Sequence, residues 1–191
     1  FGFLSENANF ARMCARCGVT FIGPSPEAML LMGDKATAKQ TMRDADVPVV
    51  PGSDGLIGSV EEAAEIAARV GYPVMIKASA GGGGRGIRRV DRPEELEDAI
   101  TTAKREAQSF FGDDGVYLEK FIVDPRHVEV QLLADHYGNV VHLGERDCSL
   151  QRRNQKMLEE CPCPVLSPEM RKKMGDAAVR AAIACGYENA G

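Results

Sequence analysis

The sequence of 191 residues lacks a surplus of positive charge, and it lacks any long hydrophobic run. Its formal net charge is −5, which argues against a general nucleic-acid binder because such proteins are usually basic. No apolar run approaches the roughly 20 residues needed to span a bilayer, and no signal-peptide pattern is present. We therefore expect neither nucleic acid nor a membrane as a partner.

Histidine is also scarce, and this affects the interpretation of the six cysteines. Cys14 and Cys17 lie close together, and Cys161 and Cys163 form a second close pair. None of the three histidines completes a familiar zinc spacing with them, so structural zinc is the less favoured alternative. We expect buried free thiols in a reducing compartment, and therefore a cytoplasmic location.

Helix and strand signals in residues 1–48 are typical of the end of an α/β domain. A first helix is predicted with Ser5 as its N-cap, followed by a short strand over residues 19–23. Two further helices are predicted to begin after the caps Ser25 and Asp34.

Residues 49–121 are predicted to form a small α+β module. A capping box at Ser59 and Glu62 starts one helix, and Pro93 starts a second. The segments "PVMIK", "IRRV" and "VYLEKF" are predicted to be three short strands of the sheet that these helices cover.

Residues 122–191 contain an expected hairpin followed by a helix. The segment "HVEVQLLAD" alternates with period two, which predicts a half-buried antiparallel strand. The turn "HYGN" then connects it to its expected partner "VVHLGERDCS". The last helix is predicted to begin after Ser167 and to end at Gly186.

A glycine tract in "KASAGGGGRGIRRV", residues 77–90, lies between two predicted strands. A dinucleotide-binding fold would need a helix after the tract, and a P-loop would need Gly-Lys-Ser/Thr at its end. We predict instead a strand–loop–strand flap over phosphates, because a backbone without Cβ atoms can approach the phosphate oxygens. Ordering four glycines costs roughly 4–8 kcal/mol, so we expect Gly81–Gly86 to be mobile without nucleotide; a plain flexible hairpin is the alternative.

Two lysines lie near this tract in the sequence. Lys77 ends the strand that leads into it, and Lys35 follows Gly33 and Asp34. A lone lysine is usually a solvated surface charge, but about 4 Å from a phosphate charge it would contribute about 4 kcal/mol before desolvation is subtracted. At the end of the module, the N–H and C=O groups of an extended backbone over Glu119–Ile122 could bind the edge of a purine base.

Eight motifs in chain order carry a family resemblance: "GFLSENANFA", "FIGP", "MGDK", "VPGSDG", "GYPVMIKASAGGGGRG", "YLEKF", "PRHVEVQ" and "ERDCSLQRRNQK". With these motifs the chain resembles the biotin carboxylase component of biotin-dependent carboxylases, in the ATP-grasp superfamily. The resemblance covers the whole chain but well under half of that enzyme, and both ends, Phe1 and Gly191, look like cuts. It implies an α/β and α+β ATP-grasp fold. Residues 1–48 would be the end of the N-terminal domain with its linker, 49–121 the lid domain, and 122–191 the first part of the C-terminal ATP-grasp domain.

The resemblance implies the chemistry of an ATP-dependent ligase. Family members carboxylate biotin with MgATP and bicarbonate: bicarbonate attacks the γ-phosphate to give carboxyphosphate, which delivers CO2 to the ureido nitrogen of biotin. The implied partners are ATP, Mg²⁺, bicarbonate, a biotin carboxyl carrier protein and a carboxyltransferase, in a homodimeric parent enzyme. A bacterial acetyl-CoA carboxylase subunit of fatty acid biosynthesis is the first expectation, with propionyl-CoA, pyruvate and other acceptors left open.

The resemblance also implies a set of site residues. Those expected to bind ATP are Lys35, Lys77, Gly83, Gly84, Glu119, Lys120, Phe121, Ile122, His127, Gln151 and Asn154. The lysines and glycines would contact the phosphates, the Glu119–Ile122 segment would hold the adenine largely through its backbone, and His127 would lie near the ribose and phosphates. Lys156 matches the lysine that holds bicarbonate, as a fixed cation for an anionic nucleophile.

The chain departs from the family pattern at one position in the site. Asn154 stands where the family's best-known motif has histidine, and it can donate a hydrogen bond to a phosphate but carries no charge. The carboxylates that bind Mg²⁺, and the arginines that complete the bicarbonate and biotin sites, would lie beyond Gly191. We therefore expect the 191-residue chain to be inactive alone, because phosphoryl transfer relies on charge neutralisation by metal.

Two alternatives remain open from the sequence. Another ATP-grasp ligase, such as a carbamoyl-phosphate synthetase relative, would share the flap and the lid but should lack "ERDCSLQRRNQK". A non-catalytic nucleotide-binding or interaction module with a glycine linker is the alternative from a different functional class.

Overall fold

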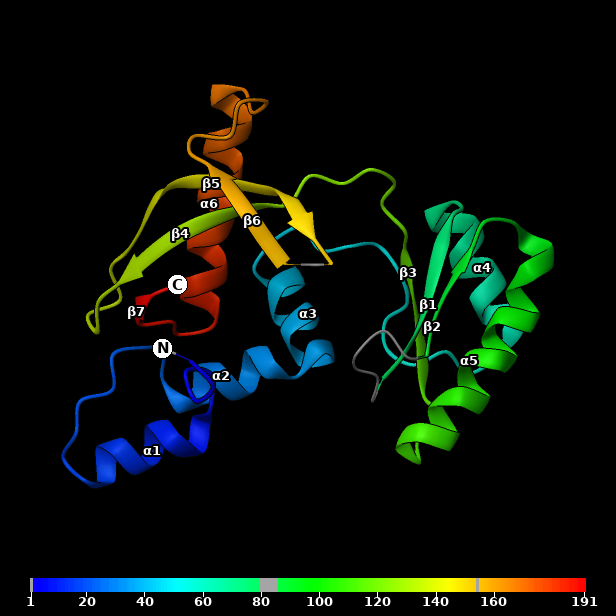
Figure 1. Cartoon of the computed structure of the whole chain (residues 1–191), viewed down its shortest axis with the longest axis horizontal. Coiled ribbons are helices and arrows are strands. Elements are labelled where there is room, and N and C mark those ends of the chain that lie inside the picture. The colour runs from blue at the N-terminus through cyan, green and yellow to red at the C-terminus, as the bar shows by residue number, and fades with distance from the viewer. Residues whose placement is uncertain (1, 80–85, 154) are drawn as a thin grey trace. The chain divides into compact units, whose positions relative to one another are not determined.

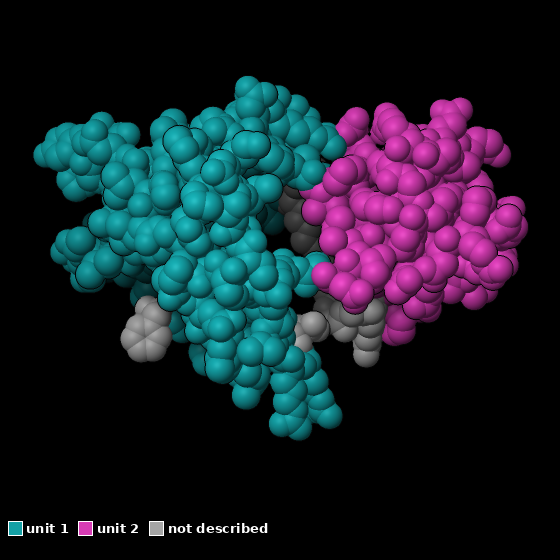
Figure 2. Space-filling view, turned by 90° about the horizontal axis from the view of Figure 1, so that it is seen from above, with its two compact units in different colours: residues 1–49, 125–191 teal, residues 50–124 magenta. Residues whose placement is uncertain are grey.

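A computed structural model describes residues 2–79, 86–153 and 155–191, with the side chains of Lys35 and Ala36 excepted. These residues divide into two compact units, which Figure 2 colours separately. One unit is the continuous stretch 50–124, and the other combines residues 1–49 with residues 125–191. The second unit is therefore built from two stretches that the first unit separates in the sequence.

Residues 50–124 form a three-stranded antiparallel sheet with helices on one face (Figure 1). Its strands, in spatial order, are β2 (Ile87–Val90), β1 (Val74–Ala78) and β3 (Val116–Lys120). Its helical elements are α4 (Val60–Val70), the 3-10 turn η1 (Pro93–Glu95) and α5 (Leu96–Phe111). The predicted order of elements in this part of the chain is confirmed.

The core of this unit lies between the sheet and the two helices. Val74 and Ile76 of the central strand β1 are fully buried, and Ala67 of α4 and Ile100 of α5 belong to the same cluster. Because successive side chains of a strand point to opposite faces, Lys77 and its alternate neighbours project from the face away from the helices. The hydrophobic core thus orients Lys77.

Helix α4 starts and ends as its sequence predicts. The Ser59 hydroxyl accepts a hydrogen bond from the Glu62 N–H at 3.2 Å, and the helix ends at Gly71, whose φ is +77°. The Glu62 carboxylate differs slightly from the predicted capping box, because it accepts from the N–H of Gly58 at 2.8 Å.

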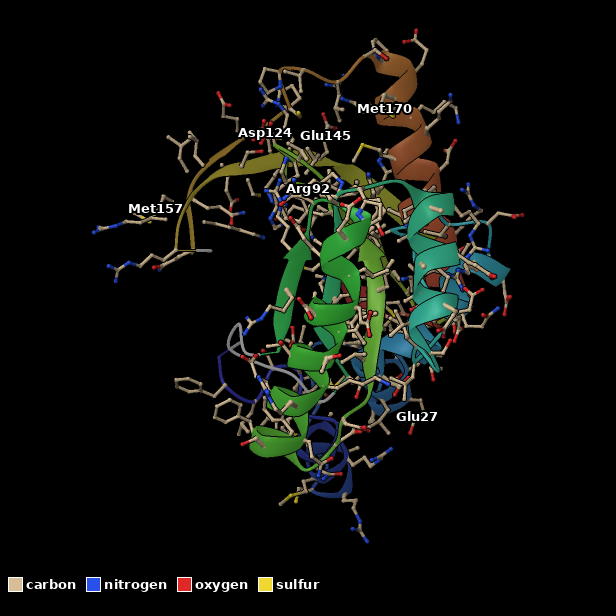
Figure 3. All side chains as sticks on the ribbon, turned by 90° about the vertical axis from the view of Figure 1, so that its right-hand side faces the viewer. Glu27, Arg92, Asp124, Glu145, Met157 and Met170 are labelled. Atoms are coloured by element: carbon tan, nitrogen blue, oxygen red, sulfur yellow. The ribbon has the colours of Figure 1, made fainter. Side chains whose placement is uncertain are left out.

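Residues 1–49 and 125–191 form a four-stranded antiparallel sheet and four helices. The strands, in spatial order, are β6 (Gln155–Glu160), β5 (Val140–Arg152), β4 (Val128–Ala134) and β7 (Asn189–Ala190). The helices are α1 (Ala8–Arg16), α2 (Pro26–Gly33), α3 (Lys35–Asp44) and α6 (Pro168–Ala184). Helix α6 packs on β4 and β5, and Glu145 of β5, labelled in Figure 3, accepts from Arg171 of α6 at 2.7 Å.

Two expectations for the first 49 residues are wrong. Helix α1 begins one residue after Asn7, whose side chain accepts from the N–H of Phe10 at 2.9 Å, whereas the Ser5 hydroxyl donates to a carbonyl outside the helix. The predicted strand over residues 19–23 does not form. A strand needs a neighbour to satisfy its N–H and C=O groups, and none of the described strands pairs with this segment; the Gly23 carbonyl instead accepts from the Asn189 side chain at 2.8 Å.

Two further sequence expectations concern cysteines and membranes. All six cysteines are free thiols, but only Cys148 and Cys163 are buried, so the expectation of buried thiols is wrong for the other four. None of the helices in the described part of the chain combines the length and the apolar character needed to cross a bilayer.

Candidate functional site

Lys77 and Glu119 form an ion pair on the open face of the sheet of residues 50–124. Lys77 Nζ lies 2.6 Å from Glu119 Oε2, and the two side chains are 33% and 18% exposed. Glu119 pairs in register with Met75, so it is a diagonal neighbour of Lys77 across β1 and β3. An ammonium carries three donors, so this pair fixes Lys77 beside the glycine tract without using its whole capacity to bind an anion.

Lys120 has a different geometry from the one its predicted role suggests. Its Nζ donates to the carbonyl oxygens of Gly71 and Tyr72 at 2.8 and 2.9 Å, so the side chain is bound to the C-terminal end of α4. Its backbone N–H donates to the Pro51 carbonyl at 2.7 Å. The Lys120 side chain is thus a structural anchor within this unit, and its backbone N–H has a partner as well.

The predicted adenine segment continues past the end of β3. The Phe121 N–H donates to the Pro73 carbonyl at 3.1 Å, and the Ile122 side chain is 48% exposed. The guanidinium carbon of Arg89 lies 4.5 Å from the centroid of the Phe121 ring, a cation–π contact that sequence reasoning missed. The strand register pairs Arg89 with Met75 and so places Arg89 on the Lys77 face, and this register is known only from the structure.

The glycine tract ends at Gly86, which precedes β2 and bonds to the last residue of β1. The Gly86 carbonyl accepts from the Ala78 N–H at 2.9 Å, its φ is +67°, and a Cβ there would lie 2.7 Å from the Ala78 Cβ. Glycine is therefore required at this end of the tract. Gly83, Gly84 and the side chain of Lys35 lie outside the described residues, so their predicted roles and the predicted mobility stay predictions.

A charged cluster spans three strands of the other sheet. Glu129 of β4 faces Arg146 of β5 in register, and Arg146 Nε and Nη2 donate to Glu129 Oε1 at 2.8 and 2.5 Å. Lys156 extends from β6 across β5 to pair with the other oxygen, Oε2. One carboxylate thus holds two cations: the predicted bicarbonate lysine, and an arginine that sequence reasoning missed.

These contacts fix the charge state of the cluster. The hydrogen bond from Lys156, followed by that from Arg146, lowers the pKa of Glu129 to about 2 against the opposing effect of burial. The same carboxylate raises the pKa of Lys156, whose side chain remains 38% exposed. At neutral pH Lys156 is therefore a charged ammonium that is held in place and accessible to solvent.

The low pKa of Glu129 predicts acid sensitivity. Its pKa is about 2 in the folded protein and near 4.5 in the unfolded chain, so its stabilisation is complete above pH 4.5 and is lost as the pH falls toward 2. We expect the free energy of unfolding, measured with urea across this range, to fall less steeply in Glu129→Gln than in the wild type. Glu65→Gln, on the exposed side of α4, is the control, and equal slopes for all three proteins would contradict the prediction.

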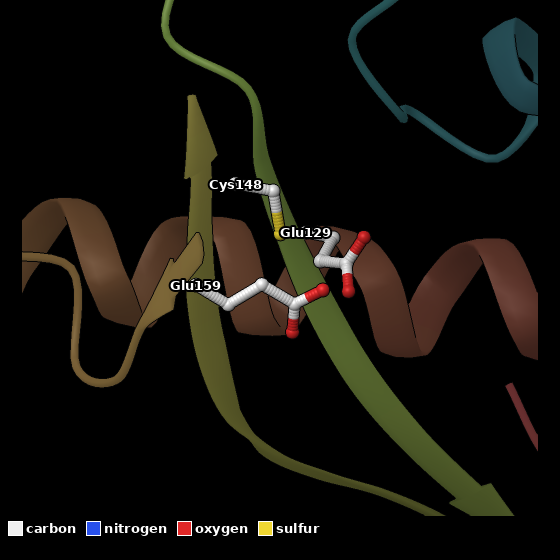
Figure 4. Close-up of side chains that lie close together, drawn as sticks. All are labelled: Glu129, Cys148 and Glu159. Atoms are coloured by element: carbon white, nitrogen blue, oxygen red, sulfur yellow. The ribbon is translucent and has the colours of Figure 1, made fainter. Parts of the chain in front are cut away.

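Cys148 and Glu159 lie beside Glu129 and form with it a group of three potential metal ligands (Figure 4). Burial is the largest cause that raises the pKa of the Cys148 thiol, followed by the nearby carboxylates, so the thiol is protonated at neutral pH. Mg²⁺ takes oxygen ligands in near-octahedral geometry, and Glu129 already has two cationic partners. This group does not fit Mg²⁺, and the expectation that the Mg²⁺ ligands lie beyond Gly191 stays a prediction.

His127 and Gln151 meet in a hollow of about 440 Å³ in the same unit, lined by Pro125, Arg126, His127, Val128, Ser149 and Gln151. Gln151 Nε2 lies 2.8 Å from His127 Nδ1. An amide NH2 group donates, so Nδ1 accepts and the neutral imidazole carries its hydrogen on Nε2. The structure thus brings together two predicted ATP-binding residues, whereas Asn154 lies outside the described part.

The three-stranded unit with its glycine tract and the curled antiparallel sheet with its cationic cluster define an ATP-grasp fold. The family model described as "Carbamoyl-phosphate synthase L chain, ATP binding domain" matches residues 34–191, and "Biotin carboxylase, N-terminal domain" matches residues 1–29. The chain belongs to the family of these carbamoyl-phosphate synthase L-chain ATP-binding domains.

Several relatives that match the whole chain are biotin carboxylases, which confirms the resemblance. Biotin carboxylase 2 of Populus trichocarpa is 60% identical over all 191 residues, which are 36% of that protein. The solved biotin carboxylase–beta-gamma-ATP complex from Campylobacter jejuni has a TM-score of 0.83 at 53% identity, and the whole chain covers 43% of it. The biotin carboxylase domain of a thermophilic 2-oxoglutarate carboxylase bound to bicarbonate has a TM-score of 0.91 at 50% identity, with 41% covered. The chain thus spans well under half of these relatives.

Proposed function

We propose that this chain supplies the lid and part of the active site of a biotin carboxylase, an ATP-dependent ligase that carboxylates carrier-bound biotin. The observation that carries the proposal is the exposed ammonium of Lys156, held by Glu129 beside Arg146 on a rigid sheet. The match to a bicarbonate-bound biotin carboxylase domain at a TM-score of 0.91 supports it.

In this proposal Lys156 binds bicarbonate and orients it. The anion accepts a hydrogen bond from the ammonium, whose charge Glu129 keeps in place but does not cover completely. A bicarbonate oxygen then forms a bond to the γ-phosphorus of ATP, the bond to the bridging oxygen breaks, and ADP leaves with that electron pair. The resulting carboxyphosphate splits into CO2 and phosphate, the ureido nitrogen of biotin forms a bond to the CO2 carbon, and the proton from that nitrogen passes to the phosphate. Fixing an anionic nucleophile in this way lowers the entropic part of the barrier.

Several predicted residues would contact the nucleotide. Lys77, with Lys35, Gly83 and Gly84, would contact the phosphates. The Glu119–Ile122 backbone would bind the adenine edge, since the Lys120 side chain is bound to α4. In the hollow, His127 would donate from Nε2–H to the ribose or a phosphate oxygen, with Gln151 fixing its ring and Asn154 as a neutral donor nearby.

The wider setting of the reaction follows from the family. Mg²⁺ would neutralise phosphate charge from carboxylates outside this chain, so the 191 residues alone would be inactive. A biotin carboxyl carrier protein would present biotin, a carboxyltransferase would complete the reaction, and the parent would be a homodimer. Acetyl-CoA is the first acceptor to test, which would place the protein in fatty acid biosynthesis, and the free thiols favour the cytoplasm.

Lys77→Ala in the full-length protein tests the nucleotide part of this proposal. Loss of a lysine charge next to phosphates is expected to weaken ATP binding at least about tenfold, measured by titration calorimetry. Arg69→Ala removes one positive charge from the exposed side of α4 and should leave the affinity unchanged. Equal affinity of Lys77→Ala and the wild type would favour a non-catalytic module.

A further inference from the structure

Asp147 of β5 is a buried carboxylate with four hydrogen-bond donors around it. The residue is 4% exposed. Its Oδ1 accepts from the Ser149 N–H at 3.0 Å and from the Ser149 hydroxyl at 2.5 Å. Its Oδ2 accepts from Arg126 Nη1 at 2.8 Å and from the Cys163 thiol at 3.3 Å. The two bonds from Ser149 are the largest causes that lower the pKa of Asp147, so it is ionised at neutral pH.

Ser149 connects this carboxylate to His127. An ionised carboxylate can only accept, so the Ser149 hydroxyl hydrogen must point at Asp147. This leaves the hydroxyl oxygen to accept from the His127 N–H, at 3.0 Å. The His127 carbonyl in turn accepts from the Cys148 N–H at 2.7 Å. The backbone of His127 is therefore held on both sides by β5, and Asp147 sets the direction of one of the two bonds.

A β-bulge in β5 makes these contacts available. The pairing of β5 with β6 shifts register between Asp147 and Leu150 and again between Leu150 and Gln151. A bulge interrupts the hydrogen bonds between paired strands and changes the direction in which nearby side chains point. At this bulge Gln151 Nε2 contacts the Cys148 carbonyl at 2.9 Å and His127 Nδ1 at 2.8 Å. Residues 148–151 of β5 thus hold both the ring and the backbone of His127, and Asp147 bonds to this segment through Ser149.

Arg126 is the second connection from Asp147 to the hollow. Its side chain is 51% exposed while the Asp147 side chain is 3% exposed, so the ion pair joins a buried anion to the lining of the hollow. Arg126 also directly precedes His127 in the chain. Asp147 therefore restrains the segment that carries His127 through Ser149 on one side and Arg126 on the other.

We infer that Asp147 is a positioning residue for nucleotide binding: through Ser149 and Arg126 it holds His127 against Gln151 in the wall of the hollow. The inference rests on the proposed function, because that function assigns a nucleotide to this hollow. Asp147 itself touches no substrate in this scheme.

Three variants of the full-length protein test the inference. Asp147→Asn places an amide opposite Arg126, and Ser149→Ala removes the connection while leaving the Asp147–Arg126 pair intact. Glu145→Gln is the matched control, because Glu145 is 2% exposed on the same strand but bonds to Arg171 of α6 and the Cys163 N–H. We expect the first two variants to weaken ATP binding about tenfold, the usual cost of leaving one polar group unpaired. Glu145→Gln should lower the thermal midpoint and leave ATP affinity within about twofold.

A second measurement follows His127 directly and needs no activity. With ¹⁵N-histidine labelling, and the His127 signals assigned by their loss in His127→Gln, the wild type should show one tautomer, in which Nδ1 accepts from Gln151 and Nε2 carries the hydrogen. Asp147→Asn and Ser149→Ala should show a mixture of both tautomers, and Ser149→Ala decides alone if Asp147→Asn does not fold. If Ser149→Ala kept the ATP affinity and the His127 spectrum of the wild type, the inference would be overturned. It would also be overturned if Glu145→Gln lost as much ATP affinity as Asp147→Asn and Ser149→Ala. A wild-type protein that binds no ATP would instead overturn the proposed function, while the spectra would still report whether Asp147 positions His127.

Discussion

Lys156→Gln in the full-length protein is expected to lower bicarbonate-dependent ATP hydrolysis by about 10²–10³-fold, the size of effect seen when one preorganised electrostatic group is lost. Glutamine keeps a hydrogen-bond donor and most of the side-chain length but removes the charge that faces the anion. ATP affinity should stay within about threefold, because the nucleotide contacts of the proposal lie elsewhere. The measurements are steady-state turnover with and without bicarbonate and ATP binding by calorimetry.

The matched control for this prediction is Lys172→Gln. Lys172 lies on α6, its side chain is 74% exposed, and it pairs with Asp176 one turn later. Exposed pairs of this kind contribute little to stability, so turnover should be unchanged. If Lys156→Gln instead abolished ATP binding, Lys156 would belong to the nucleotide site. If it behaved like Lys172→Gln, the bicarbonate site would have to be sought in another part of the protein.

Helices that are bounded by clear capping residues were predictable from the local sequence. The capping box at Ser59 and the glycine at position 71 bound α4 in both the sequence and the structure. Ser167 with a following proline predicted α6 in the same way. The N-terminal cap of α1 was misplaced because Ser5 and Asn7 are both good caps two residues apart, and only the packing of the helix decides between them.

Strands were predictable where one face is buried and hard to predict where neither is. The alternation in "HVEVQLLAD" follows from one face packing on α6 and the other carrying charge. Strand β6 was missed because all six of its residues are exposed, so it shows no alternation, and Met157 there is 63% exposed (Figure 3). Its existence depends on pairing with β5, which is a tertiary property.

The residues of the candidate site were likewise predictable only in part. Lys77 was predictable, because it ends a buried strand beside a glycine tract. The partnership of Glu129 with Arg146 needs the register of the β4–β5 hairpin, which shifts between Val130 and Leu132 and so does not follow from the turn "HYGN" alone. The connections of Asp147 to Arg126 and Ser149 depend on a bulge, and no sequence pattern marked it. Partnerships between strands therefore required the structure, whereas residue types at strand ends did not.

Gly52→Ala is expected to have the second large effect, through β3. The backbone of Gly52 bridges Glu119, and a Cβ on Gly52 would lie 2.1 Å from the Leu118 carbonyl oxygen and 2.9 Å from the Glu119 Cα. Both are backbone atoms of β3, so neither can yield as the end of a flexible side chain would. The neighbouring bonds from Ser53 N–H to Leu118 at 2.8 Å and from Lys120 N–H to Pro51 at 2.7 Å would be strained together.

Gly52→Ala should therefore lower the free energy of unfolding by about 3 kcal/mol or more, measured by urea denaturation of the full-length protein. ATP affinity should fall as well, because displacement of β3 moves the Glu119–Ile122 segment that the proposed function assigns to adenine. Gly33→Ala is the control: it lies at the end of α2, where no described atom comes within 4 Å of an added Cβ, and it should change stability by less than about 1 kcal/mol. Lost stability with unchanged ATP affinity would separate the packing of β3 from nucleotide binding and would argue against the adenine role of Glu119–Ile122.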